Sequence, residues 1–494
     1  MRSTLTAQAG LLTGSRALGQ LLNAFTGIFV VRALSQADYG TYRQLLLLYA
    51  SILLFGDAGF SQALYKFIPP RREQAHRYLS QALVATLGLS VLWVAGLIPL
   101  STWVAQFFGN GDLVPHMVLL AAFLGLSLLC KVPEAALITL ERVRILALNT
   151  GFFESLKFAM VLAALWAGQG IRGLLQVMVI ATTLKLAHLL WAVRDQIRLV
   201  SPAGFSVQLR YAMVLLLPGL LNNAATYAHQ YIVGYYFNPA QYAVYAVACF
   251  QVPLIGVLST SVAEVLLVRA TELHRQNRRK ELLQVWLTAC RKAQMVFLPV
   301  TFACAALAGP LLITLFTPRY AESRPLFIVI VLGLAFNGIF QDSILRACSA
   351  MRAYSFFYAL RAVLALGLGI VGVRYYGLWG AAISTFGTMF ILNVWQLVKV
   401  GQLLGVGFST VLPWRDLGRI SLVSGACAIL AAVIARPIPL APVALAAGGS
   451  AFALGYVALA LRMGLLTPEE TRGLIGQLRA GCNRLGILRP KVVT

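Results

Sequence analysis

Long apolar runs separated by short charged connectors dominate this sequence. A run of about 20 apolar residues spans a bilayer as a helix. Hydrophobic residues make up 59% of the chain and charged residues only 11%, whereas a soluble domain carries about 25% charged residues. The sequence therefore predicts an all-α polytopic membrane protein.

The apolar runs predict about fourteen transmembrane helices. We place them near residues 10–34, 40–64, 79–105, 113–140, 145–167, 172–193, 209–236, 241–268, 286–316, 324–349, 353–373, 378–402, 416–435 and 440–462. The connectors between them are short, which leaves no room for a catalytic domain outside the membrane.

The formal net charge of +24 reports topology and not a nucleic-acid partner. Lys and Arg concentrate in alternate connectors, most densely in 269–292, whereas connectors such as 107–112 and 236–241 are nearly free of them. This positive-inside pattern places both termini in the cytoplasm. The seven cysteines fall mostly within apolar runs, so no disulfide framework is expected.

Two short connectors resemble each other. "SQADYGTY" begins at Ser35 and "NPAQYAVY" at Asn238, and their tyrosines lie 203 residues apart (242 − 39). Glu134 and Asp342 lie 208 apart (342 − 134). Such offsets predict two copies of a six-helix unit in one orientation, related by a pseudo-two-fold axis along the membrane normal.

This repeat predicts four parts of the chain. Residues 1–200 form an N-lobe with helices 1–6, and residues 201–410 form a C-lobe with helices 7–12. Residues 411–462 hold two additional helices, and residues 463–494 form a basic amphipathic tail, capped at Thr467, on the cytoplasmic membrane surface. Two lobes that face a shared cavity suit alternating access.

The connector "ALSQADYG" (33–40) and the run "YYGLWGAAIST" (375–385) resemble the polysaccharide transporter (Wzx-like) flippases of the multidrug/oligosaccharidyl-lipid/polysaccharide exporter superfamily. The element "SRALG" (15–19) resembles the first helix of lipid II flippases. The resemblance implies a V-shaped transporter in the bacterial inner membrane. It would move an undecaprenyl-pyrophosphate-linked oligosaccharide, such as an O-antigen, capsule or exopolysaccharide unit, between leaflets. Membrane lipids, a polysaccharide polymerase and a glycosyltransferase are the implied partners.

Ionisable residues inside spans are functional candidates, because burying a charge in a bilayer is costly. Arginine donates bidentate hydrogen bonds to pyrophosphate oxygens. We expect a headgroup site built from four cationic side chains: Arg16, Arg43, Lys131 and Lys157. The alternatives are an interfacial position for Arg43 and a buried structural pair for Arg16, with Asp57 as its partner.

Carboxylates within the spans are candidates for proton coupling. They are Asp57, Glu134, Glu154 and Asp342. The spacings Lys131–Glu134, Glu154–Lys157 and Asp342–Arg346 place each pair on one helix face, so structural ion pairs are the competing interpretation. Lys185 has no acid nearby in sequence, so it would either extend its ammonium group to the membrane interface or pair with another helix.

The predicted helix 209–236 carries amides and aromatic residues that suit sugar rings. The candidate sugar-binding residues are Asn222, Asn223, Tyr227, Gln230 and Tyr231. An aromatic packing seam is the alternative, since Tyr227 and Tyr231 share one helix face.

Three other functions compete with the polysaccharide flippase. They are a lipid II flippase, a cation or drug antiporter of the same superfamily, and a membrane glycosyltransferase. The chain shows no P-loop, no HExxH motif and no clustered Cys/His ligands. The sequence therefore predicts a protein that is not an enzyme and needs no cofactor or metal.

Overall fold

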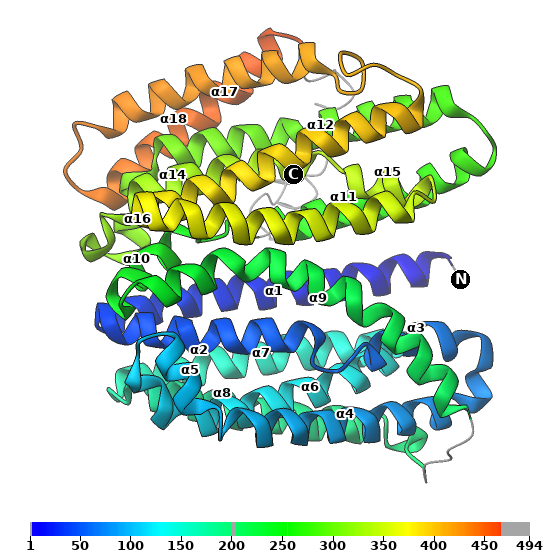
Figure 1. Cartoon of the computed structure of the whole chain (residues 1–494). Helices are drawn as coiled ribbons and strands as arrows, with labels where there is room; N and C mark the ends of the chain where they lie inside the picture. Colours follow the sequence, from blue (N-terminus) through cyan, green and yellow to red (C-terminus); the bar gives the residue numbers. More distant parts are fainter. Residues whose placement is uncertain (1, 199–203, 254, 466–494) are drawn as a thin grey trace, which may run out of the picture.

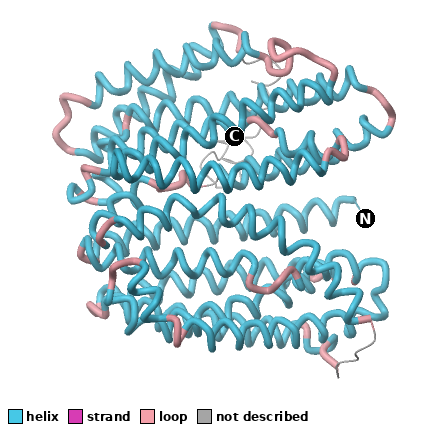
Figure 2. The backbone as a smooth tube through the Cα atoms, in the orientation of Figure 1, coloured by secondary structure: helices cyan, strands magenta, loops and turns pink. Residues whose placement is uncertain are grey.

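The computed structural model describes residues 2–198, 204–253 and 255–465, which form helices joined by short loops (Figure 2). The predicted tail helix from Thr467 lies outside the described residues. The first part of the chain contains α1 (Arg2–Ala33), α2 (Gln36–Phe55), α3 (Phe60–Phe67), α4 (Ala75–Leu97), α5 (Ser101–Phe107), α6 (Met117–Thr139), α7 (Val143–Trp166) and α8 (Gly170–Ala192). The second part contains α9 (Phe205–Tyr236), α10 (Pro239–Ala248), α11 (Ile255–Arg275), α12 (Arg279–Ala306), α13 (Ala308–Phe316), α14 (Ser323–Leu332), α15 (Gln341–Ala347), α16 (Met351–Leu404), α17 (Trp414–Ala435) and α18 (Ala441–Arg462).

Within the described residues, ten helical segments are long and apolar enough to cross a membrane, or eleven when the pair α12–α13, bent by 77°, counts as one span. This confirms an all-helical, multi-pass membrane protein. The number fourteen stays a prediction. One reason for the lower count is α16, which turns back at Gly377 (φ +59°). Its two arms run antiparallel, since the Ser384 hydroxyl donates to the Leu368 carbonyl at 2.7 Å.

Several expected spans are interrupted. The segment predicted at 40–64 breaks between α2 and α3, where Ala58 and Gly59 adopt left-handed backbone angles (φ +48° and +85°). The segment predicted at 241–268 breaks between α10 and α11 near Pro253, and the segment predicted at 324–349 breaks between α14 and α15. A broken helix exposes backbone N–H and C=O groups, which in transporters face binding sites.

The two similar connectors each begin a helix, and they meet in space. Ser35 caps the N-terminus of α2 by accepting from the Asp38 amide, and Asn238 caps α10 by accepting from the Gln241 amide. Gly40 packs directly on Pro239, because a Cβ at Gly40 would lie 1.8 Å from the Pro239 carbonyl oxygen. The two similar connectors therefore lie against each other.

Two groups of helices lie on either side of α1 and α9 (Figure 1). One group holds α2–α8 and the other holds α11–α18. Helix α9 contacts both groups: Phe205 stacks on Phe60 of α3 at 6.0 Å, and Ile232 faces Gly369 of α16. We call residues up to α8 the N-terminal half and α9–α16 the C-terminal half. The division into lobes at residue 200 stays a prediction.

Candidate functional site

A cavity of about 640 Å³ lies between the two halves. Helices α1, α2 and α7 line it from the N-terminal half, and α9, α10 and the break after α10 line it from the C-terminal half. We call it the central cavity. Among the residues predicted to bind substrate or couple protons, it brings together Arg43, Lys157, Glu154, Tyr227 and Gln230.

Arg43 lies on α2 and reaches the central cavity among tyrosines, with Tyr39 and Tyr42 on the same wall. It forms no hydrogen bond or ion pair within the described part of the chain, and its Nε atom is buried without a partner. The side chain as a whole is half-buried, and a guanidinium that is partly withdrawn from water without a partner is costly. An anion in the cavity would supply the missing acceptors.

Lys157 and Glu154 form the i,i+3 ion pair that the sequence predicts, with Nζ and Oε2 2.5 Å apart. Asn23 of α1 also donates to Glu154 at 3.4 Å. Glu154 thus balances Lys157, and the cationic character of the central cavity rests on Arg43.

Arg16 is exposed on α1 and is not among the lining residues of the central cavity. Gly19, one turn further along α1, faces Glu154, since a Cβ there would lie 3.3 Å from Glu154 Cγ. Residues 16, 19 and 23 share one helix face. Arg16 therefore lies on the same face of α1 as Asn23, two turns before the residue that lines the central cavity.

Lys131 pairs with Asp57 and not with Glu134, so the predicted Lys131–Glu134 pair is wrong. Lys131 Nζ lies 2.5 Å from Asp57 Oδ1 and also donates to the Leu53 carbonyl at 3.1 Å. Asp57 accepts from the amide and hydroxyl of Ser61 at the start of α3. The alternative Arg16–Asp57 pair is wrong for the same reason. The Lys131–Asp57 pair stabilises the break between α2 and α3.

Glu134 pairs with Lys185 of α8 at 2.7 Å, which confirms that Lys185 finds its acid on another helix. Both residues line a cavity of about 170 Å³ inside the N-terminal half, together with Glu154 and Lys157. Since Glu154 and Lys157 also line the central cavity, a chain of charged residues runs from the central cavity into the N-terminal half.

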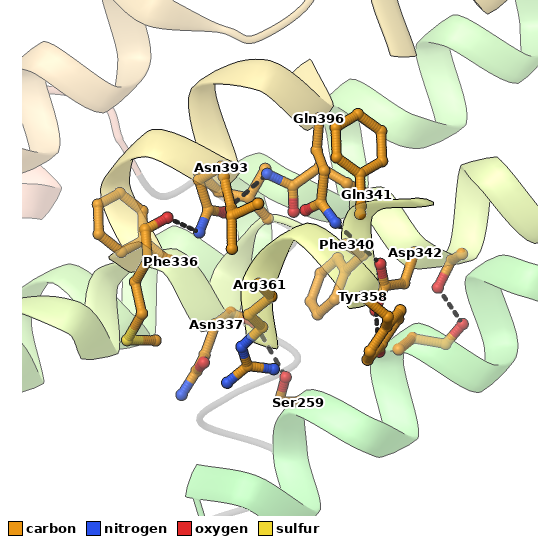
Figure 3. Close-up of a pocket in the computed structure, with 16 residues that line it drawn as sticks. Ser259, Phe336, Asn337, Phe340, Gln341, Asp342, Tyr358, Arg361, Asn393 and Gln396 are labelled. Carbon is orange, nitrogen blue, oxygen red and sulfur yellow. Dashed lines mark hydrogen bonds between the residues drawn. The ribbon is translucent and has the colours of Figure 1, made fainter. Parts of the chain in front are cut away.

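Asp342 does not form the predicted ion pair with Arg346 within the described residues. Its carboxylate accepts from the Tyr358 hydroxyl at 2.8 Å and from the Gln396 amide at 3.5 Å. These residues line a cavity of about 260 Å³ in the C-terminal half (Figure 3), which we call the distal cavity.

The predicted sugar-binding residues of α9 divide into two sets. Tyr227 and Gln230 line the central cavity. Tyr231 bonds to the Ser51 hydroxyl at 2.5 Å, and Asn223 donates to the Ser51 carbonyl, so both join α9 to α2. The Asn222 carbonyl accepts from the Thr226 hydroxyl within α9. Only Tyr227 and Gln230 therefore stand where a ligand in the central cavity would meet them.

Arg361 was not predicted as a site residue. It lies on the first arm of α16, lines the distal cavity, and also lines a cavity of about 330 Å³ beside the central cavity. The signal was present: a single arginine interrupts the apolar run 353–373 with no acid three or four residues away. In the described part of the chain, no group of three or more His, Cys, Asp or Glu residues could hold a metal ion.

The family comparison matches residues 29–325 to a family described as "Polysaccharide biosynthesis protein". The chain belongs to this family. Comparison with curated proteins found no sequence match. This match confirms the resemblance to the polysaccharide transporter family, which was based on the connector 33–40 and the run 375–385.

Solved structures show which fold this family member has. The lipid II flippase MurJ in an inward closed conformation is 14% identical with a TM-score of 0.71, over 92% of this chain and 99% of that one. An inward-facing multidrug resistance MATE family transporter of the MOP superfamily is 16% identical with a TM-score of 0.65, over 78% and 95%. A MOP superfamily transporter from Pyrococcus furiosus is 15% identical with a TM-score of 0.56, over 80% and 96%. These proteins are transporters and flippases, not enzymes, and the chain has their fold.

Proposed function

We propose that this protein is a flippase of the bacterial cytoplasmic membrane. It moves an undecaprenyl-pyrophosphate-linked oligosaccharide from the inner to the outer leaflet by alternating access. The family match to polysaccharide biosynthesis, the transporter fold and a large cavity between two halves support this proposal.

The observation that carries the proposal is the unpaired Arg43 in the central cavity. The planar fork of a guanidinium matches two phosphate oxygens at once. Lys157 adds a second donor nearby, although Glu154 shares its charge. Arg16, exposed on the same face of α1 as Asn23, would guide the anionic headgroup toward the cavity. Lys131, held by Asp57, positions the break between α2 and α3.

Alternating access requires the two halves to part at one end and meet at the other. In this structure they meet where the connectors at Gly40 and Pro239 pack together. These connectors lie on the side with few Lys and Arg residues, which the positive-inside pattern assigns to the outside. With this proposed orientation, the state is closed to the outside, and loading would occur from the cytoplasm.

The test is a lipid extract of the native host, analysed by mass spectrometry before and after depletion of this protein. We expect an undecaprenyl-pyrophosphate oligosaccharide to accumulate. Wild type and Arg269→Ala, a control at a surface ion pair with Glu272, should clear it, whereas Arg43→Ala should not. Unchanged lipid-linked intermediates, or full clearance by Arg43→Ala, would reject the proposal.

A lipid II flippase is the second candidate, because MurJ shares the fold over 92% of this chain. Its substrate also carries an undecaprenyl pyrophosphate, so Arg43 serves either substrate. The identity of the accumulated lipid separates the two: a muropeptide on the lipid would assign lipid II, and a repeat-unit glycan would assign the polysaccharide pathway.

A further inference from the structure

A second cavity of about 330 Å³ lies beside the central cavity, in the C-terminal half. We call it the side cavity. Tyr227, Gln230, Phe250 and Gln251 line both cavities, so the two share a wall. Binding pockets for small molecules begin at about 300 Å³. The side cavity therefore suits one sugar ring and not a lipid tail or a whole oligosaccharide.

Arg361 brings a cation to the side cavity. It forms no hydrogen bond or ion pair within the described residues. Its guanidinium points toward Asn337 and Ser259, whereas Asp342 turns toward Tyr358 on the other side (Figure 3). Asp342 and Arg361 act on each other only through space. Asn337 lines both the distal and the side cavity, whereas Ser259 lines the distal cavity. The guanidinium therefore lies at the border of the two cavities, where its N–H donors can meet a ligand.

Two further features of the side cavity favour a polar, anionic ligand. Thr388 is 3% exposed, and its hydroxyl has no partner in the part of the chain that the structure describes. Ile255 and Gly256, at the start of α11, also line the cavity. The N-terminus of a helix carries unpaired N–H groups and a partial positive charge, which attract an anion.

We propose that the side cavity binds one carboxylate-bearing sugar of the transported glycan, a uronic acid or a similar acidic sugar. Arg361 and the N-terminus of α11 receive the carboxylate, and Thr388 with Gln251 hydrogen-bonds to ring hydroxyls. This inference rests on the proposed function and makes the glycan bind at two points. Arg43 holds the pyrophosphate in the central cavity, and Arg361 selects the sugar beyond the wall formed by Tyr227 and Gln230.

The competing interpretation is that Arg361 only balances the charge of Asp342. The two interpretations differ in what the arginine recognises. A counter-ion becomes dispensable once Asp342 is neutral, whereas a carboxylate-binding arginine remains necessary for the acidic substrate. A variant pair at these two positions therefore separates them.

The experiment uses the full chain in proteoliposomes and the lipid-linked oligosaccharide that accumulates on depletion. Half of this lipid is treated with carbodiimide and borohydride, which reduces sugar carboxylates to alcohols and leaves the neutral sugars intact. We expect the untreated glycan to contain a carboxylate and wild type to transport it at least tenfold faster than the reduced form.

Arg361→Gln should transport the untreated and the reduced forms at similar rates, and Arg361→Lys should keep part of the preference for the untreated form. The double variant Arg361→Gln/Asp342→Asn should behave like Arg361→Gln. A neutral native glycan, equal rates for both forms with wild type, or a preference restored in the double variant would overturn the inference. Transport lost in Arg43→Ala, together with any of these results, would leave the flippase proposal standing and reject only the acidic-sugar site.

Discussion

Arg32 Nε donates a hydrogen bond of 3.0 Å to the carbonyl oxygen of Leu315 and thereby joins the two halves of the protein. The same guanidinium donates to the carbonyl of Thr314. Arg32 lies in the last turn of α1, and both acceptors lie in the last turn of α13, where the carbonyls of a helix lack intrahelical partners. Arg32 therefore acts as a cap for α13 that is supplied by the opposite half.

Arg32→Ala should shift the protein away from the state in this structure, because Arg32 and the end of α13 must part when the two halves separate at this end of the molecule. A net hydrogen bond to a charged group contributes about 1.5–3 kcal/mol, so we expect the alternative state to gain at least about tenfold in population. Spin labels at Trp103→Cys and Tyr375→Cys in a cysteine-free background would report this by electron–electron double resonance. Both positions are exposed, at 62% and 74%.

The matched control for Arg32 is Arg374→Ala, which removes an exposed arginine of α16. Its distance distribution should match that of the parent. If Arg32→Ala also leaves the distribution unchanged, Arg32 does not hold the halves together.

Gly40→Ala should disrupt the contact between the connectors. An added Cβ would lie 1.8 Å from the Pro239 carbonyl oxygen, and backbone atoms cannot yield as a flexible side chain would. We expect a melting temperature several degrees lower in detergent micelles. Gly88→Ala on α4 is the control, because a Cβ there has no neighbour within 4 Å, and Ala stabilises a helix by about 1 kcal/mol relative to Gly. Equal melting temperatures for the two variants would contradict the close contact.

Asp57→Asn and Lys131→Gln should each destabilise the protein strongly. The Asp57 side chain is only 2% exposed, and removal of one partner from a buried ion pair costs about 3–5 kcal/mol. The double variant should lose less than the sum of the single losses, since neither charge is left alone. Unfolding in denaturant provides the double-mutant cycle, and additive losses would show that the two residues do not depend on each other.

Asp195→Asn should reduce stability at neutral pH and not at low pH. The Arg142 guanidinium holds the pKa of Asp195 well below its usual range, with Nη1 2.7 Å from Oδ1. The ion pair therefore contributes its full stabilisation to the folded state above the ordinary aspartate pKa of about 4. This stabilisation is lost as the pH falls through the lowered pKa of Asp195. The difference in melting temperature between wild type and Asp195→Asn should shrink steadily below about pH 4.

Asp112→Asn serves as the control for the pH experiment, because Asp112 forms no ion pair within the described residues. The melting temperature of Asp112→Asn should follow that of wild type as the pH changes. A difference for Asp195→Asn that stays constant down to the lowest pH would exclude the ion pair as its cause.

Much of the fold could be predicted from the apolar periodicity. The helices predicted at 145–167 and 172–193 correspond to α7 (Val143–Trp166) and α8 (Gly170–Ala192) almost residue for residue. A long apolar run that is bounded by glycine or charged residues fixes the ends of its helix through local sequence signals. The break between α14 and α15 was not predicted, because an apolar run reads the same whether its helix is continuous or interrupted.

Of the three ion pairs predicted within one helix, only Glu154–Lys157 forms within the described residues. Glu154–Lys157 follows from spacing, whereas Lys131–Asp57 and Glu134–Lys185 join helices whose contact depends on tertiary packing. Arg43 and Lys157 were assigned to the headgroup site from residue chemistry, and the structure brings both to one cavity. Arg361 could have been predicted from the sequence alone, because it is an isolated charge within the predicted span 353–373.

The contact between Gly40 and Pro239 has a consequence for the origin of the two-part chain. At the offset of 203 residues that relates the connectors, Gly40 corresponds to Ala243 and Pro239 corresponds to Gln36 (243 − 40 = 239 − 36 = 203). In a symmetric dimer of identical units, every contact between two different positions occurs twice, once on each side of the axis. A single chain that holds both units is free of this constraint, so the glycine and the proline are each needed only once, and the two connectors can differ where they meet.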